Sequence, residues 1–204
     1  MLVAALTGNY GMGKSFVLSA FRDMGAVTLD SDRVVELLLK EAGVIEEVRK
    51  LLGSDVVAAA GVLDKKAVAA KIFHDPELKK RLEEIIHPLV FERVSDFIGR
   101  IKEKNRVVIV EVPLLFEGHY QGDFSKVITV YAPEEAAIAR LENFGVTREE
   151  ALLRLRSQLP IEEKKARADY LIDNGGSKEE TLTQVAEVYR LLCEETKRGG
   201  TAKN

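Results

Sequence analysis

The sequence predicts an α/β fold in which a parallel sheet is flanked by helices, and two observations support this prediction. Short apolar runs, each ending in a polar or glycine-rich loop, occur at residues 2–6, 26–29, 106–110, 127–131 and 170–172, as expected of buried parallel strands. Helix-periodic segments separate these runs along the chain. Strands that alternate with helices indicate one α/β domain with a parallel sheet.

The composition is that of a globular protein with one large core and additional subdomains. Of the 204 residues, 46% are hydrophobic and 31% are charged, and the net charge is −3. A chain of this length can bury a sizeable core. The near balance of 30 basic and 33 acidic residues gives no electrostatic reason to expect nucleic acid or an anionic membrane as a partner.

Cysteine content and hydropathy indicate a cytoplasmic protein. Cys193 is the sole cysteine, which excludes an intrachain disulfide and suits a reducing compartment. No uncharged run approaches the roughly 20 residues that a membrane helix needs, so no membrane span is expected. These features leave the oligomeric state unpredicted.

A glycine-rich loop follows the first predicted strand and leads into a helix expected over residues 15–24. Residues 8–15 read GNYGMGKS, which matches the Walker A pattern G-x-x-x-x-G-K-S at every defining position. Gly8, Gly11 and Gly13 allow the backbone to curl so that successive N–H groups face one anion, which the helix N-terminus also attracts. The sequence therefore predicts a P-loop nucleoside-triphosphate-binding fold.

Residues at the end of this loop are expected to contact ATP. Lys14 is expected to reach the β and γ phosphates, and the Ser15 hydroxyl is expected to bind Mg²⁺. Met12 contributes loop backbone, and the N–H of Phe16 is expected to meet the α phosphate. The loop alone does not distinguish a kinase from a hydrolase or a GTPase, but an Asn-Lys-x-Asp guanine motif is absent, which disfavours a GTPase.

Two acidic residues follow the second predicted strand. Asp30 and Asp32 should lie near the phosphates, because the carboxyl ends of parallel strands meet at one edge of the sheet, where ligands bind. A carboxylate there can accept the proton of an acceptor hydroxyl during phosphoryl transfer, and we assign this role to Asp32. Alternatively, both residues only cap the helix that begins near Arg33, and for Asp30 the two interpretations remain equally open.

Residues 44–103 are expected to form a helical insertion, because segments such as 64–73 and 77–97 are charged and helix-periodic. The pair His87-Pro88 should mark a kink or a helix boundary, since the residue before proline is disfavoured in the α region. His87 then either lines the site of the phosphoryl acceptor or is satisfied by local hydrogen bonds.

The segment after the predicted strand 106–110 should lie beside the phosphates. Glu111 ends this strand and either holds Mg²⁺ through water or is only solvated. An apolar stretch follows it and either contacts the acceptor substrate or belongs to the core; its residues are Pro113, Leu114, Leu115 and Phe116.

Helix signals in the last third of the chain predict a helical hairpin at residues 133–158 and a final helix capped by Ser177. Thr147 is the expected N-cap of the second hairpin helix, with Glu150 completing a capping box. Asp173-Asn174-Gly175-Gly176 is expected to be a turn. The predicted division is therefore a core of residues 1–43, 104–132 and 159–196, the insertion 44–103, the hairpin 133–158 and a disordered tail 197–204.

Several motifs, in order and spacing, resemble the dephospho-CoA kinase family over nearly the whole chain. They are Leu6-Thr7-Gly8 leading into Gly13-Lys14-Ser15, Asp30-x-Asp32, His87-Pro88, Val112-Pro113-Leu114-Leu115-Phe116-Glu117, Arg140-Leu141, Arg154-x-x-x-Gln158 and Ile172-Asp173-Asn174-Gly175.

The resemblance implies transfer of the ATP γ-phosphoryl group to the ribose 3′-hydroxyl of dephospho-CoA, the last step of coenzyme A synthesis, with Mg²⁺ as cofactor. It implies a P-loop core, a CoA-binding insertion and a lid formed by the hairpin. It makes Asp32 the catalytic base and Arg140 a phosphate-clamping residue, and it places Asn174 and Gly175 near the adenine, although these two can also be only a turn.

The chain departs from the family pattern in two places. Asn9, Tyr10 and Met12 stand where the family usually has Gly, Ile and Ser, and Glu142-Asn143-Phe144 replaces a region that often carries a second arginine. Two alternatives therefore stay open: another small-molecule P-loop kinase, or a nucleotide-binding regulator without catalysis.

Overall fold

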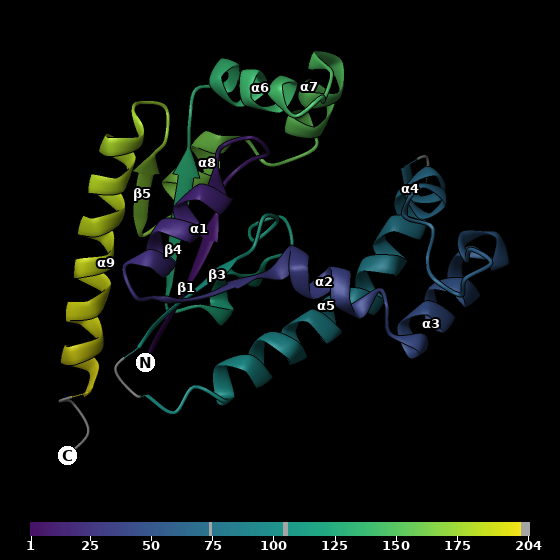
Figure 1. The fold of residues 1–204 in the computed structure, drawn as a ribbon, viewed down its shortest axis with the longest axis horizontal. Coiled ribbons are helices and arrows are strands. Elements are labelled where there is room, and N and C mark those ends of the chain that lie inside the picture. The colour runs from purple at the N-terminus through teal and green to yellow at the C-terminus, as the bar shows by residue number, and fades with distance from the viewer. Residues whose placement is uncertain (74, 104–105, 201–204) are drawn as a thin grey trace. The chain divides into compact units, whose positions relative to one another are not determined.

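The computed structural model describes residues 1–73, 75–103 and 106–200, of which 199 and 200 are described by backbone alone. In this part of the chain a five-stranded sheet has the order β2-β3-β1-β4-β5, and the pairings are all parallel (Figure 1). The strands are β1 (Leu2–Thr7), β2 (Val27–Asp30), β3 (Val107–Glu111), β4 (Lys126–Tyr131) and β5 (Tyr170–Asp173). The predicted fold class is confirmed.

The inner strands are mainly apolar because both of their faces are covered. Ala4, Ala5 and Leu6 of β1 are fully buried, and every residue of β3 is buried, as in parallel sheets with helices on both sides. The register places Leu6 opposite Glu111, and Glu111 opposite Asp30. The carboxyl ends of β1, β2 and β3 therefore lie at one edge.

Two layers cover the sheet. On one face, α1 (Lys14–Asp23) and α9 (Lys178–Gly200) pack through Phe21 and Val185 against Ile109 and Ile172, and Figure 1 shows α9 beside β5. On the other face, Ala5 and Val127 contact Leu115 and Phe116. The remaining helices of this part are α6 (Glu134–Asn143), α7 (Arg148–Arg156), α8 (Ile161–Ala166) and the 3₁₀ turn η2 (Tyr120–Asp123).

The expected helix caps are present. The Thr147 hydroxyl accepts a hydrogen bond from the Glu150 N–H at 3.2 Å. At α9, the Ser177 hydroxyl accepts from the Glu180 N–H at 3.2 Å, and the Glu180 carboxylate accepts from the Ser177 N–H at 2.8 Å. This reciprocal capping box satisfies two of the N–H groups that a helix start leaves unpaired.

The predicted start of a disordered tail at residue 197 is wrong for 197–200. Helix α9 continues to Gly200; within it Thr196 is buried, and its hydroxyl bonds to the carbonyl groups of Leu192 and Cys193 in the preceding turn. The rest of the predicted tail, residues 201–204, lies outside the described residues.

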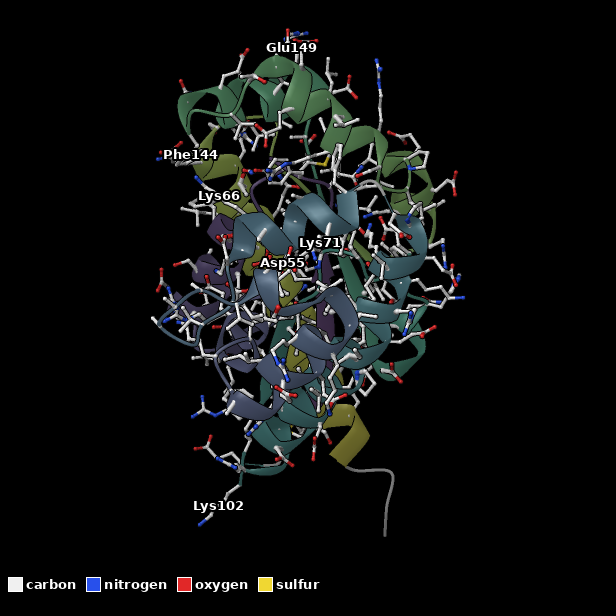
Figure 2. All side chains as sticks on the ribbon, turned by 90° about the vertical axis from the view of Figure 1, so that its right-hand side faces the viewer. Asp55, Lys66, Lys71, Lys102, Phe144 and Glu149 are labelled. Atoms are coloured by element: carbon white, nitrogen blue, oxygen red, sulfur yellow. The ribbon has the colours of Figure 1, made fainter. Side chains whose placement is uncertain are left out.

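Residues Ser31–Ile101 form a second compact unit with its own core. Its helices are α2 (Ser31–Leu38), α3 (Ala42–Leu52), α4 (Lys65–Phe73), α5 (Pro76–Gly99) and the 3₁₀ turn η1 (Ser54–Val56). Val44, Val48, Leu52 and Ile86 are buried together, and Lys71 pairs with Asp55 at 2.6 Å (Figure 2). The unit begins at Ser31 rather than at residue 44 because α2 packs against α5.

Of the kink or helix boundary expected at His87-Pro88, the boundary does not occur. Pro88 lies inside α5, which continues for about three more turns to Gly99. Proline removes one helical N–H and crowds the preceding turn, but α5 packs against α2, α3 and α4, and this packing maintains the helix. None of the helices described combines the length and the apolarity that a membrane span requires.

The hydrogen bond that joins β5 to the end of α9 predicts a loss of stability at alkaline pH. The Tyr170 hydroxyl donates to the Glu195 carboxylate at 2.6 Å, and burial, this hydrogen bond and nearby negative charge raise the pKa of Tyr170 to about 12. Since an unfolded tyrosine titrates near pH 10, the contribution is complete below about pH 10 and is lost as the pH rises towards 12.

We therefore expect Tyr170→Phe to lower the free energy of unfolding by roughly 1 kcal/mol at pH 8, and the wild-type advantage to disappear by about pH 12. Urea unfolding at several pH values measures both. A difference between the two proteins that stays constant up to pH 12 would contradict the raised pKa.

Candidate active site

The glycine-rich loop between β1 and α1 has room only for glycine at three positions. Gly8, Gly11 and Gly13 have φ angles of 146°, 76° and 86°. A Cβ at Gly8 would lie 2.2 Å from the Val130 carbonyl oxygen, and one at Gly11 would lie 2.7 Å from the Ala137 carbonyl oxygen. The loop backbone therefore curls tightly against β4 and α6.

Helix α1 starts at this loop with an N-terminus suited to an anion. Gly13, at the N-cap, has no side chain to cap the first N–H groups, and the first turn contains no acidic residue. The positive end of the helix dipole and these N–H groups therefore favour a bound anion. Ser15, in this first turn, is an exposed residue.

Lys14 and Phe16 are held within the loop and the first turn. The Lys14 side chain is mostly buried, and its Nζ donates to the Asn9 carbonyl oxygen at 3.3 Å. The Phe16 N–H, which we expected at the α phosphate, donates to the Gly13 carbonyl oxygen at 3.1 Å. Its side chain packs against the core.

The turn after β5 and the first hairpin helix meet at this loop. The Asn174 side chain donates to the Met12 carbonyl oxygen at 2.9 Å, and Arg140 of α6 donates to the Asn174 carbonyl oxygen at 2.6 Å. A Cβ on Gly13 would lie 2.1 Å from the Asn174 Nδ2 and 3.7 Å from an Arg140 guanidinium nitrogen. The structure thus brings Arg140 and Asn174, predicted from distant motifs, to the same loop.

One guanidinium nitrogen of Arg140, Nη1, is buried without a hydrogen-bond partner among the described residues. Leaving such a donor unsatisfied costs about 1–3 kcal/mol, and more for a charged group. A phosphate oxygen at the loop would satisfy it with a charge-assisted bond. Gly175 stands beside this site, where a Cβ would lie 2.5 Å from the Pro133 ring.

The residues that depart from the family pattern bind the loop to the second hairpin helix. The Tyr10 N–H donates to the Gln158 side chain at 2.8 Å, and the Asn9 side chain donates to the Leu159 carbonyl oxygen at 3.0 Å. Arg154 donates to the Tyr10 hydroxyl at 2.9 Å and lies over its ring. Arg154 lies on α7, as expected, whereas Gln158 follows the end of this helix at Arg156; the sequence did not indicate the partners of either residue.

Oxygen ligands gather at the carboxyl edge of the sheet. Asp30 ends β2 and Glu111 ends β3, and they are register partners. Carboxylate and hydroxyl oxygens are what Mg²⁺ prefers, so the side chains of Asp30, Glu111 and Ser15 are of the chemical kind that fits this ion. Asp32 lies in the first turn of α2, within the second unit.

The second unit contains an apolar cavity of about 350 Å³ lined by His87, Val35, Leu39 and Ile86, among others. Burial lowers the pKa of His87, and the nearby Glu83 carboxylate opposes this effect. His87 is therefore a half-buried side chain at an apolar cavity, as the acceptor-site interpretation requires.

The apolar stretch after β3 belongs mainly to the core. Leu115 and Phe116 are 0% and 1% exposed and pack with Ala5 and Val127, so their burial overturns the expectation that they contact a substrate. Leu114 is exposed. The Pro113 carbonyl oxygen accepts from the Thr7 hydroxyl at 3.2 Å, next to the glycine-rich loop.

Glu117 and Lys164 form a buried ion pair that had no assigned role in the sequence analysis. The Lys164 side chain is 0% exposed, and its Nζ lies 2.7 Å from the Glu117 carboxylate. Burial lowers the pKa of Lys164, and Glu117 opposes the shift. The run Ile161-Glu162-Glu163-Lys164-Lys165 resembles a solvated helix face, so the sequence contains no signal for this pair.

The crowding at Gly13 predicts a specific defect. Gly13→Ala must strain the left-handed φ angle and displace Asn174, so we expect stability to fall by roughly 1–3 kcal/mol and nucleotide affinity to fall with it. Gly43→Ala is the matched control, because Gly43 lies in α3 with open space around its Cβ position. Thermal unfolding and calorimetric titration with ATP measure the two effects, and unchanged ATP affinity of Gly13→Ala would contradict this account of the loop.

Comparisons with known proteins agree with this geometry. Residues 2–180 match the model of the family described as dephospho-CoA kinase. A curated dephospho-CoA kinase from Aquifex aeolicus is 39% identical over 188 residues, which is 92% of this chain and 95% of that protein.

Solved structures show the same similarity. A crystal structure from Thermus thermophilus has a TM-score of 0.84 at 34% identity, covering 93% of this chain and 96% of that one. A dephospho-CoA kinase from Campylobacter jejuni has a TM-score of 0.71 at 25% identity, covering 95% and 98%. With its glycine-rich loop, sheet edge and hairpin arginine in place, the chain belongs to the dephospho-CoA kinase family.

Proposed function

We propose that this protein is an ATP-dependent kinase that transfers the γ-phosphoryl group of ATP to the ribose 3′-hydroxyl of dephospho-CoA, the final step of coenzyme A synthesis. The observation that carries the proposal is the meeting of Arg140 and Asn174 at Gly13. The unsatisfied guanidinium N–H there calls for an anion, and family membership identifies the anion as the ATP polyphosphate.

ATP is bound by the loop residues Gly8, Gly11, Met12, Gly13, Lys14, Ser15 and Phe16, together with Arg140, Asn174 and Gly175. The N-terminus of α1 and the Lys14 ammonium neutralise the phosphates, while Arg140 clamps them from the hairpin. Phosphoryl transfer requires mainly positioning and charge stabilisation. Lys14 and Arg140 are therefore catalytic residues in this proposal.

Magnesium is the metal we assign, with Ser15 as a ligand and Glu111 acting through water. When bound, Mg²⁺ neutralises charge on the transferred phosphoryl oxygens. One direct protein oxygen ligand and one carboxylate reached through water suit an ion that keeps most of its waters.

Asp32 is the proposed base that accepts the proton of the 3′-hydroxyl. It follows Asp30, at the sheet edge, by two residues and is the second residue of the second unit. Residues 44–103, most of which belong to this unit, are the proposed dephospho-CoA-binding region. His87, Pro113 and Leu114 contact the acceptor in this proposal.

Residues 133–158 form the proposed lid. We also place the enzyme in the cytoplasm.

The base assignment predicts a loss of turnover without a loss of binding. Asp32→Asn should reduce kcat for CoA formation by about 10²- to 10⁴-fold, the contribution typical of general bases, and should leave ATP affinity unchanged. Chromatography and mass spectrometry of reactions containing Mg-ATP and dephospho-CoA give the rate. Asp23→Asn, at an exposed position on α1, is the matched control.

The outcomes separate the activity from the base. A wild-type protein that binds ATP but forms no CoA would contradict the assignment of dephospho-CoA as the acceptor, and other hydroxyl compounds would then be tested. Full activity of Asp32→Asn would contradict only the assignment of Asp32 as the base.

The clamp assignment predicts weaker nucleotide binding on removal of the hairpin guanidinium. Arg140→Met removes charge-assisted hydrogen bonds worth about 1.5–3 kcal/mol, so ATP should bind roughly 10- to 150-fold less tightly. Arg148→Met is the control in the same hairpin, because Arg148 is exposed and forms an ion pair with Glu135 on the hairpin surface. Calorimetry measures both affinities, and equal ATP binding by both variants would remove Arg140 from the site.

A further inference from the structure

A chain of hydrogen bonds connects the buried ion pair Glu117–Lys164 with both ends of the glycine-rich loop. On one side, Lys164 Nζ donates to the Pro113 carbonyl oxygen at 3.3 Å. The same oxygen accepts from the hydroxyl of Thr7 at 3.2 Å, the residue directly before Gly8. The ion pair therefore supports the strand end from which the loop begins.

The other side of the chain passes through Leu159. Its N–H donates to the Glu117 carboxylate at 3.0 Å, and its carbonyl oxygen accepts from the Asn9 side chain at 3.0 Å. Asn9 in turn accepts, at its own carbonyl oxygen, the Lys14 Nζ at 3.3 Å. The two hydrogen bonds of Leu159, both at 3.0 Å, are within the usual range for N–H···O bonds, and the Lys14 bond is slightly longer. Hydrogen-bonded links of this kind orient one another.

Stability alone does not account for such an ion pair. The Lys164 side chain is completely buried, and the cost of removing two charges from water commonly cancels their attraction, so apolar replacements of equal size are often as stable. The pair instead orients two backbone groups. The Glu117 carboxylate holds the Leu159 N–H, and the Lys164 ammonium holds the Pro113 carbonyl oxygen. Both fixed groups adjoin the phosphate loop.

We infer that Glu117 and Lys164 are positioning residues for nucleotide binding, which set the loop backbone through Leu159 and Pro113 and thereby hold Lys14 in place. Neither residue contacts the nucleotide in this assignment. The inference rests on the proposed function only in that the loop binds ATP.

The test compares two double variants that contain no unpaired buried charge. Glu117→Gln with Lys164→Met keeps an oxygen that accepts the Leu159 N–H, whereas Glu117→Leu with Lys164→Met has nearly the same volume and no acceptor. The probe is a non-hydrolysable ATP analogue with Mg²⁺, titrated calorimetrically. We expect the Gln variant to bind within about threefold of wild type and the Leu variant to bind about tenfold less tightly, since the difference is one hydrogen bond.

A matched control separates positioning from general stability. Lys126→Met removes an ion pair with Asp169 and Glu195 at the start of β4, the opposite end of the strand from the loop. It should lower the unfolding temperature and leave affinity for the analogue unchanged. In steady-state assays, the Leu variant should raise the KM for ATP and leave the KM for dephospho-CoA unchanged.

Equal affinity of the two double variants would overturn the inference. If either fails to fold, Asn9→Ala breaks the same chain at its other end and should also weaken binding about tenfold, the value of one hydrogen bond; wild-type affinity of Asn9→Ala would then overturn it. A wild-type protein that does not bind the analogue would instead contradict the proposed function, so the two failures are distinguishable.

Discussion

The structure of the site depends on the absence of side chains at three positions of one loop. At Gly8, Gly11 and Gly13 any Cβ would collide with a carbonyl oxygen of β4, a carbonyl oxygen of α6 or the Asn174 amide. Elements far apart in sequence can therefore approach the loop backbone closely. Their approach leaves backbone N–H groups and the start of α1 facing a single region, which is what an anion site requires.

Charge at this site comes from groups whose positions are set by other groups. Arg140 reaches the loop because its guanidinium bonds to the Asn174 carbonyl oxygen, and Lys14 is held by the Asn9 carbonyl oxygen. The hairpin is also tied to the loop through Tyr10, which packs against the hairpin core of Ile138, Leu141 and Leu155. Phe144, at the outer end of this hairpin, is 85% exposed (Figure 2).

Much of the fold was predictable because its signals are local. Buried parallel strands need continuous apolar runs, and every predicted strand is present within a residue or two of its expected bounds. The loop glycines and the helix caps at Thr147 and Ser177 could likewise be predicted from the local sequence. Packing decided what local signals left open between two alternatives: Pro88 remains within a helix instead of ending it, and Leu115 and Phe116 belong to the core.

By itself, the sequence determined the order of strands and helices, the phosphate loop and the family, because strand burial, backbone sterics and helix capping depend on neighbouring residues. The tertiary structure decided which side chains meet. Lys164 and Lys165 are adjacent and alike, yet Lys164 is 0% exposed and pairs with Glu117, whereas Lys165 stays partly exposed, pairs with Glu162 and lies over the Tyr131 ring. Burial and partners depend on segments distant along the chain, and no local pattern encodes them.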